Sequence, residues 1–464
     1  MEIEAAIEFA IRLGADYVDI RWEQTQSETL LVKNGKVESA IYEEHGGAGI
    51  RVLLNTWGFA SISSFERQKV EDAIRRAIAM AKASRRSTKP RLAQSGVAED
   101  KVKLTPEIDP FDIPMEEKIE ICLEADHRAK VNEDVKRTSA SIFNGRARKL
   151  FVSSEGARID QELPLTYCHV LALAKSGGVV EYMDDMAGGS GGFEIVRDFD
   201  MNARAEDAGK KAVALSKARA VRPRKLPVIL DPDFVSLLCH EIIGHPCEAD
   251  RVLGKEMAWA GGAWWSEKVG RRIGSRLLNA SDDPRVKSAM GYFEYDDEGV
   301  SARKKNLIKA GLLNELMHSR ETASEFKVEP NGNMRAESHE YLPLIRMSNT
   351  FIEPGDYSLE EIFDLKRGIY LKGAKVPSID SMRYNFQISA KEAYLVRHGD
   401  LEGPFRGASI ISNAPDFFMN IDAVGKDFEM RPIINCGKGD PMQTLHVGNG
   451  GPHLRSFAYV AGVK

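Results

Sequence analysis

The chain has 464 residues, 43% of them hydrophobic and 29% charged, with a net charge of −5 at pH 7, a balance typical of globular proteins. The negative charge argues against a large nucleic-acid-binding surface, and no run approaches the ~20 apolar residues that a membrane span requires. Five sparse cysteines and an acidic N-terminus without a signal-peptide pattern indicate a reducing compartment, so we expect a cytoplasmic protein.

The first predicted unit covers residues 1–88 and combines helices with short strands. Helical periodicity runs through residues 2–14, and a second helix is predicted over 65–86. Between them, alternating patterns predict strands at 17–23, 28–33, 36–42, 49–54 and 58–63. Asn34-Gly35 is typical of a tight hairpin turn.

Two further units follow a linker rich in Ser, Pro and charge. Residues 113–222 predict a middle α+β unit with helices at 115–130 and 203–220. Residues 225–464 predict a mostly β unit. The basic stretch Arg222–Lys225 is short, and we expect it to lie on a solvated linker. The overall class is α+β, with mixed N-terminal and middle units and a β-rich C-terminal domain.

The strongest chemical signal is Cys239-His240-Glu241-Ile242-Ile243-Gly244-His245-Pro246. Histidines are common zinc ligands, and a glutamate beside the first one can take a proton from a zinc-bound water. By composition alone, a His-acid-x-x-x-His match is expected only about 0.03 times. The alternative is two ordinary polar histidines on a buried helix.

The five-residue spacing of the histidines does not suit an ideal helix. At 3.6 residues per turn, their side chains diverge by roughly 140°. We therefore expect the helix to unwind or widen between His240 and His245. Gly244 permits such a distortion, and Pro246 ends the regular helix nearby. Asp231 and Pro232 mark the start of this helix as N-cap and first residue.

The third ligand stays open on the pattern alone. Glu248, Asp250 and Cys247 are close in sequence, whereas Cys436 is distant but lies in a Gly-rich stretch. Thiolate is a good zinc ligand. His446 and His453 follow as reserve ligands, in the tail after Cys436.

The chain resembles the TldD/PmbA family of metallopeptidases over nearly its whole length. The matching segments are Ala15–Asp19, Gly47–Val52, His240–His245, Asp296–Gly299, Gly332–Glu337, Pro343–Thr350 and Cys436–Lys438. The HExxxH motif identifies the TldD-type, catalytic subunit, since the sister subunit lacks it.

The resemblance implies a ligand set of His240, His245 and Cys436, with Glu241 as general base. It also implies short or unfolded peptides as substrates, bound as an extended strand. The implied assembly is a dimer, either with a second copy or with a sister subunit. We expect Zn²⁺ as cofactor, and neither a nucleic acid nor a membrane as partner.

Polar residues between apolar segments are candidates for substrate binding. They could hold a peptide backbone or stabilise an oxyanion, although an ordinary loop with a surface salt bridge is an equal alternative. The candidates are Asn333, Arg335, His339, Arg346 and Asn349.

Two other functions remain open from the sequence. A non-enzymatic interaction protein would hold a structural zinc in a closed four-ligand site. A metal-dependent amidase acting on small molecules would need a closed pocket rather than an open groove.

Overall fold

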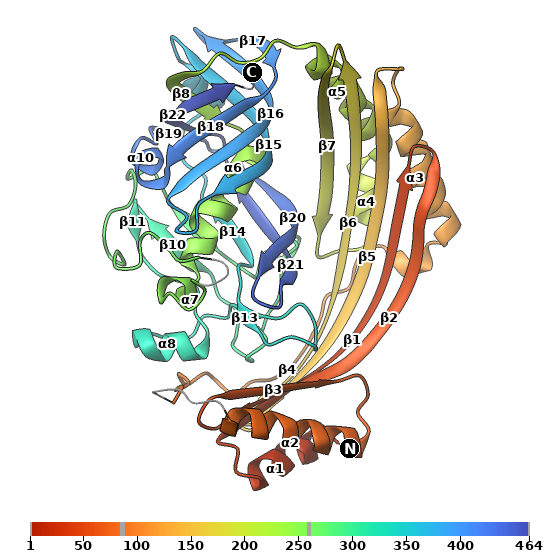
Figure 1. Ribbon diagram of the computed structural model, residues 1–464, viewed down its shortest axis with the longest axis vertical. Helices are drawn as coiled ribbons and strands as arrows, with labels where there is room; N and C mark the ends of the chain where they lie inside the picture. The colour runs from red at the N-terminus through yellow and green to blue at the C-terminus, as the bar shows by residue number, and fades with distance from the viewer. Residues whose placement is uncertain (1, 84–88, 258–260, 463–464) are drawn as a thin grey trace.

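The computed structural model describes residues 2–83, 89–257 and 261–462 and shows two parts side by side (Figure 1). One part is a tall, curved sheet with strand order β3-β2-β1-β5-β6-β4, to which β7 adds by pairing with β6. Its strands are β1 (Tyr17–Lys33), β2 (Lys36–Leu53), β3 (Trp57–Ile62), β4 (Glu99–Lys103), β5 (Val135–Ser153), β6 (Arg158–Ser176) and β7 (Val179–Gly189).

The predicted hairpin at Asn34-Gly35 is confirmed, with both residues at positive φ. β1 and β2 pair along their full length, from Tyr17↔Leu53 to Lys33↔Lys36, with one bulge between Leu31 and Val32. The short strands predicted at 17–23 and 28–33 are therefore one strand, as are those at 36–42 and 49–54. The sheet joins the strands of the first two predicted units, whose boundaries stay a prediction.

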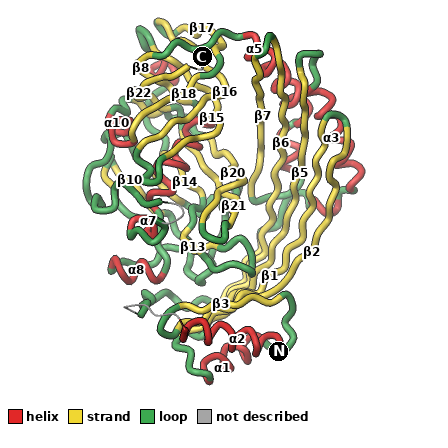
Figure 2. Tube along the Cα trace, viewed as in Figure 1, coloured by secondary structure: helices red, strands yellow, loops and turns green. Residues whose placement is uncertain are grey.

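Helices cover the two ends of the curved sheet on the same face, the one turned away from the C-terminal part (Figure 2). Around the N-terminal end, α1 and α2 bury Ile7 and Ile74 against Val18 and Ile50. At the other end, α3 and α5 bury Cys122 and Ala212 against β5 and β6. These helices are α1 (Ile3–Arg12), α2 (Arg67–Ala83), η1 (Pro110–Asp112), α3 (Met115–Ala129), α4 (Glu194–Phe199) and α5 (Met201–Lys217). The predicted helix over 65–86 ends in residues outside the described ones.

Besides a two-stranded sheet of β12 and β13, the C-terminal part that the structure describes contains two larger β structures and a central helix, α6. One is a six-stranded sheet of order β11-β10-β9-β14-β21-β20. The other is a ring in which β8, β22, β18, β16 and β15 pair in turn and β15 returns to β8. The strands are β8 (Arg224–Leu230), β9 (Ala280–Asp282), β10 (Lys305–Lys309), β11 (Leu312–Leu313), β12 (Met334–Arg335), β13 (Leu344–Ile345), β14 (Asn349–Ile352), β15 (Gly368–Ile379), β16 (Asn385–Arg397), β17 (Asp400–Phe405), β18 (Ala408–Asn413), β19 (Ala423–Val424), β20 (Glu429–Lys438), β21 (Gln443–Gly451) and β22 (Leu454–Gly462).

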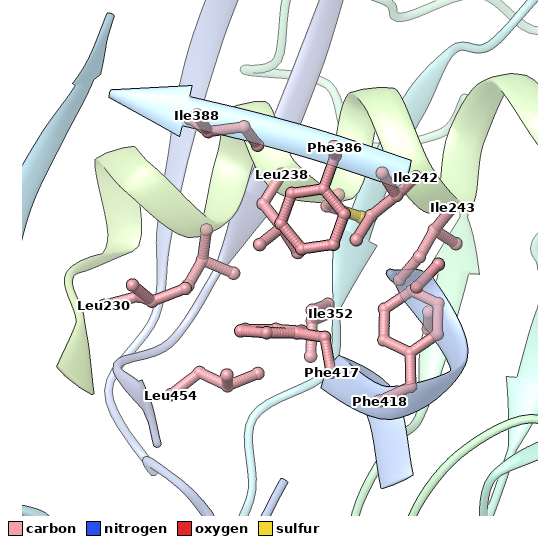
Figure 3. Close-up of a cluster of buried hydrophobic side chains, with 14 of the residues drawn as sticks. Leu230, Leu238, Ile242, Ile243, Ile352, Phe386, Ile388, Phe417, Phe418 and Leu454 are labelled. Carbon is pink, nitrogen blue, oxygen red and sulfur yellow. The ribbon is translucent and has the colours of Figure 1, made fainter. Parts of the chain in front are cut away.

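An apolar core fixes α6 between these β structures. Leu238 of α6 and Ile242 beyond it lie beside Phe386 and Ile388 of β16, while Phe417 packs from the opposite side (Figure 3). The helical segments are α6 (Pro232–Cys239), η2 (His240–Gly244), η3 (His245–Cys247), α7 (Ala249–Val252), α8 (Arg320–Phe326), α9 (Leu359–Phe363) and α10 (Ala414–Met419). The predicted α+β class is confirmed.

Buried ion pairs fasten the C-terminal part to the curved sheet. Arg51 of β2 donates to Glu298 at 3.0 Å, and Arg21 of β1 donates to Asp297 at 3.4 Å. Removing one partner of such a pair leaves a buried charge, which is strongly destabilising. Within the described residues, no helix combines the length and apolarity needed to cross a membrane.

Candidate metal centre

The segment carrying both histidines changes helical type, as their spacing predicts. Asp231 caps α6 by accepting a hydrogen bond from the Phe234 backbone N–H at 2.8 Å, and Pro232 occupies the first turn. At His240 the helix widens into a π-helical turn, closed by a bond from the His245 N–H to the His240 carbonyl. This five-residue turn brings the imidazole rings to 4.7 Å between centroids. The predicted distortion is confirmed.

Gly244 allows close packing rather than supplying the backbone freedom that the sequence suggested. Its φ of −58° and ψ of −64° are helical values that any residue adopts. A Cβ at this position, however, would lie 1.9 Å from the Met347 Sδ. Glycine is therefore favoured here because a buried side chain packs directly on the backbone.

Cys436 reaches the histidines from β20. A bulge between Ile433 and Cys436 shifts the register by one residue, so Cys436 rather than Asn435 pairs with Leu445. Bulges of this kind re-aim side chains near functional sites. The Cys436 Sγ lies 3.9 Å from the His245 Nε2. His240, His245 and Cys436 are all buried, and their ligand atoms lie within 4.8 Å of one another.

Neighbouring side chains orient both imidazoles. The Asn449 Oδ1 lies 3.0 Å from the His240 Nδ1, and its Nδ2 donates to the Thr350 carbonyl, which fixes the amide orientation. The Glu248 Oε2 lies 3.4 Å from the His245 Nδ1. Both Nδ1 atoms thus face acceptors, which directs both Nε2 atoms toward the position that a metal would occupy.

The charges of the site favour the metal-binding form of the cysteine. Burial alone would raise the pKa of the Cys436 thiol, but His240 and His245 hold this pKa well below its usual range. Burial lowers the pKa of His240, yet the Cys436 thiolate raises it to about 9. Thiolate, rather than thiol, is the form that binds metals.

These residues fit a zinc ion. Zinc binds thiolate sulfur at about 2.3 Å and imidazole nitrogen at about 2.0–2.1 Å, so two such ligands of one ion lie within roughly 4.4 Å. The observed separations of up to 4.8 Å require only small side-chain movements. In the described residues the group has three protein ligands, which leaves a tetrahedral ion one open position.

The other candidate ligands occupy different places. Cys247 is fully buried, and desolvation raises the pKa of its thiol well above the usual value. His446 lies against Phe143 and Tyr167 of the curved sheet. His453 lies 3.1 Å from the Tyr370 hydroxyl and 2.7 Å from the Asp427 carboxylate, so its ring nitrogens have other partners.

Lys438 ties the cysteine strand to the histidine segment. Its ammonium donates to Asp250 at 2.7 Å and to Glu248 at 3.2 Å, and all three side chains are largely buried. Glu248 and Asp250, considered above as ligands, therefore hold Lys438. Glu248 also contacts the Nδ1 atom of the ligand His245.

Glu241 pairs with Arg383, a residue that sequence reasoning missed. The Arg383 guanidinium donates to the Glu241 carboxylate, and both side chains are mostly buried. Burial would raise the pKa of Glu241, but His240, His245 and Arg383 lower it, so the carboxylate is ionised at neutral pH.

The turn between β15 and β16 presents Arg383 to Glu241. Arg383 has a φ of +59°, and the Asp380 carboxylate stabilises the turn by accepting from the Tyr384 and Asn385 N–H groups. A single arginine 142 residues away from Glu241 carries no readable signal in the sequence.

Two of the predicted substrate-binding residues lie close to the cysteine strand. Arg346 is fully buried and donates to the Cys436 carbonyl. Arg335 donates to the carbonyls of Met347 and His446 and lines a cavity of about 340 Å³ between the curved sheet and the C-terminal part. Arg346 thereby supports the backbone of a ligand, and Arg335 faces open space.

The other three predicted residues make structural contacts. Asn333 donates to the Asp282 carboxylate at 3.1 Å, and Asn349 accepts from the Gly291 N–H at 2.9 Å. His339 packs against β2, where a Cβ at Gly47 would lie 2.2 Å from its ring. None of the three joins the group formed by the two histidines and Cys436.

Comparisons with known proteins agree along the whole chain. Family models described as PmbA/TldA metallopeptidase domain 1, central domain and C-terminal domain match residues 18–81, 108–216 and 223–458. A metalloprotease of Methanocaldococcus jannaschii is 36% identical, over 98% of this chain and 99% of the relative. A zinc metalloprotease TldD homolog of Saccharolobus solfataricus is 30% identical, over 97% of each chain. The crystal structure of TldE from Thermococcus kodakarensis has the same fold, with a TM-score of 0.79, 20% identity, and coverage of 99% of this chain and all of that one.

Proposed function

We propose that this chain, which belongs to the PmbA/TldD family of metallopeptidases, is a zinc-dependent peptidase that hydrolyses short or unfolded peptides. The observation that carries the proposal is the buried group of His240, His245 and Cys436 with Glu241 beside it. Three protein ligands and an adjacent ionised carboxylate favour a catalytic over a structural ion.

Each residue of the site has its own role in the proposed hydrolysis. His240, His245 and Cys436 would hold the zinc ion, which would supply Lewis acidity and would lower the pKa of water to about 7. Glu241 accepts the proton of the attacking water and returns it to the leaving amine. Arg383 keeps Glu241 ionised and fixes the direction of its carboxylate. Asn449 and Glu248 hold the imidazoles in the tautomer that presents Nε2.

The position of Cys436 on an edge strand supports an extended peptide as substrate. β20 ends its sheet, and its other side carries no strand among the described residues. Around Cys436 the strand alternates, with Asn435 and Gly437 exposed and Cys436 and Lys438 buried. A peptide that pairs with such an edge places its backbone beside the metal site, whatever its side chains.

A dimer with a second copy or a sister subunit, and a cytoplasmic location, complete the proposal. The family relationship supports the dimer. The exposed Asn435 and Gly437 beside Cys436 favour an extended peptide over the closed pocket that the amidase alternative would need.

Glu241→Gln tests the proposed chemistry. The amide keeps the size of the side chain but cannot accept the proton, so zinc content and fold should be retained while peptide hydrolysis is almost lost. Full hydrolysis by this variant would remove Glu241 from the mechanism.

Substrate form is tested with one sequence presented twice, as a free peptide and inside a stable domain. Strand pairing requires free backbone N–H and C=O groups, which a folded domain does not offer. We expect cleavage of the free peptide and sparing of the folded one. Equal rates would contradict the strand-pairing model.

A further inference from the structure

The five-stranded ring of the C-terminal part opens at one end into a cavity of about 280 Å³. This end lies where β8 and β15 begin and β16 ends, because β8 and β15 are parallel and β16 is antiparallel to β15. The floor of the cavity is apolar and consists of Val221, Leu226, Ile369, Leu395, Phe405 and Val460. The mouths of β-barrels are common ligand sites.

Three arginines continue the inward-facing rows of this ring. Side chains two residues apart on a strand point to the same face. Arg224 lies two residues before Leu226, Arg367 two before Ile369, and Arg397 two after Leu395. All three arginines line the cavity, Arg224 and Arg397 at strand ends and Arg367 directly before β15, so guanidinium groups border the apolar floor.

Two more arginines reach the same mouth from the segment that joins α5 to β8. Arg219 lies over the Phe405 ring at 5.9 Å, and its carbonyl accepts from the Arg406 N–H at 3.0 Å. Arg222 follows three residues later and is exposed. Both line the cavity.

This positive charge is almost uncompensated. The single acid among the lining residues is Glu402, which lies 3.4 Å from Arg397. In the described part of the chain, neither Arg222 nor Arg367 has an ion-pair partner. Five arginines and one glutamate leave four positive charges, on a chain whose net charge is −5. Like charges held together repel one another, which an anion would relieve.

We propose that this mouth binds a small organic phosphate, with the phosphate on the arginines and a short apolar body on the floor. The planar guanidinium fork matches phosphate oxygens in pairs. A phosphate monoester carries about −1.5 to −2 charges at pH 7, so it compensates the cluster better than a carboxylate does. The basic stretch from Arg222 to Lys225 is thus part of a site rather than only a solvated linker. This proposal does not depend on the peptidase activity.

Isothermal titration calorimetry with hexyl phosphate tests the site, with hexanoate and hexanol as the matched monoanion and neutral compound. We expect binding in the order hexyl phosphate, hexanoate, hexanol. The variant Arg224→Gln/Arg367→Gln should bind hexyl phosphate at least tenfold more weakly, since it loses two guanidinium groups that would donate charge-assisted hydrogen bonds to the phosphate. The control Arg137→Gln/Arg276→Gln removes two exposed arginines elsewhere and should bind like the wild type.

Three outcomes would overturn the proposal. Hexanol that binds as tightly as hexyl phosphate would show that charge is not recognised, and hexanoate that does so would exclude a phosphate preference. Equal weakening in Arg224→Gln/Arg367→Gln and in the control Arg137→Gln/Arg276→Gln would show that the net charge of the protein, rather than the mouth of the ring, attracts the anion. The variant Arg224→Lys/Arg367→Lys keeps both positive charges and should bind hexyl phosphate more tightly than the glutamine variant. This difference shows that the weaker binding of the glutamine variant comes from lost charge and not from a damaged fold.

Discussion

The packing of Met347 on Gly244 makes a prediction whose sign is unusual for a glycine in a helix. Gly244 has helical backbone angles, so alanine there would ordinarily stabilise the protein by roughly 1 kcal/mol. The added Cβ, however, would lie 1.9 Å from the Met347 Sδ and 3.1 Å from its Cγ. Ordinary contact requires about 3.5–4 Å, so the sulfur must move by roughly 2 Å. Met347 is fully buried, and such overpacking typically costs about 1–3 kcal/mol.

A double-mutant cycle measures this contact directly. We expect Gly244→Ala to lower the midpoint of urea unfolding and the zinc content after dialysis, because the methyl displaces the turn that carries His245. In a Met347→Ala background the same change should cost nothing or stabilise, since the added methyl enters the space that Met347 left. Gly96→Ala is the control, because a Cβ there would meet nothing within 4 Å. An equal cost of Gly244→Ala with and without the Met347 side chain would refute the packing argument.

Three further predictions follow from the site and from the helix that leads to it. Arg383→Met should keep zinc but lower kcat about 10- to 100-fold, as loss of a group that orients a catalytic residue does; an unchanged kcat would show that Glu241 needs no such partner. Cys436→Ala should strongly reduce bound zinc, whereas Cys247→Ala should cost only roughly 1 kcal/mol of stability; the opposite pattern in metal analysis would reverse the ligand assignment. Burial, with the nearby Asp233, raises the pKa of Asp231 from 3.8 to about 7. The folded-state pKa lies above the unfolded value, so this contribution to stability is complete below about pH 4 and is lost as the pH rises through 7. Asp231→Asn should therefore gain about 3 kcal/mol relative to the wild type between pH 5 and pH 8, measured by urea unfolding at both values; a pH-independent difference would contradict the raised pKa.

Local chemistry explains which parts of the fold were predictable. The turn at Asn34-Gly35 and the cap at Asp231 depend on neighbouring residues, and both are confirmed. The helix distortion followed from the spacing of His240 and His245 alone. Each of these features is set within a few residues, where propensity and geometry act directly.

The full length of β2 was hidden because its first part is exposed on both faces. Residues 43–46 of β2 are exposed and lead into Gly46-Gly47, so they show no alternation and suggest a turn. Pairing with β1, from Glu23↔Gly47 to Ser27↔Glu43, keeps them extended, whereas pairing with β3 begins only at Ala48. The closed ring, the Glu241–Arg383 pair and the arginine mouth join residues more than a hundred positions apart, which no local pattern reports.

X-ray absorption at the zinc edge of the purified, zinc-loaded protein tests the central claim most directly. The account predicts one sulfur at about 2.3 Å and two imidazole nitrogens at about 2.0–2.1 Å, with one further light ligand. In Cys436→Ser the sulfur contribution should disappear, whereas in Cys247→Ser it should remain. A zinc ion without a sulfur ligand in the wild type, or one that keeps its sulfur in Cys436→Ser, would contradict the assignment of His240, His245 and Cys436 as the metal centre.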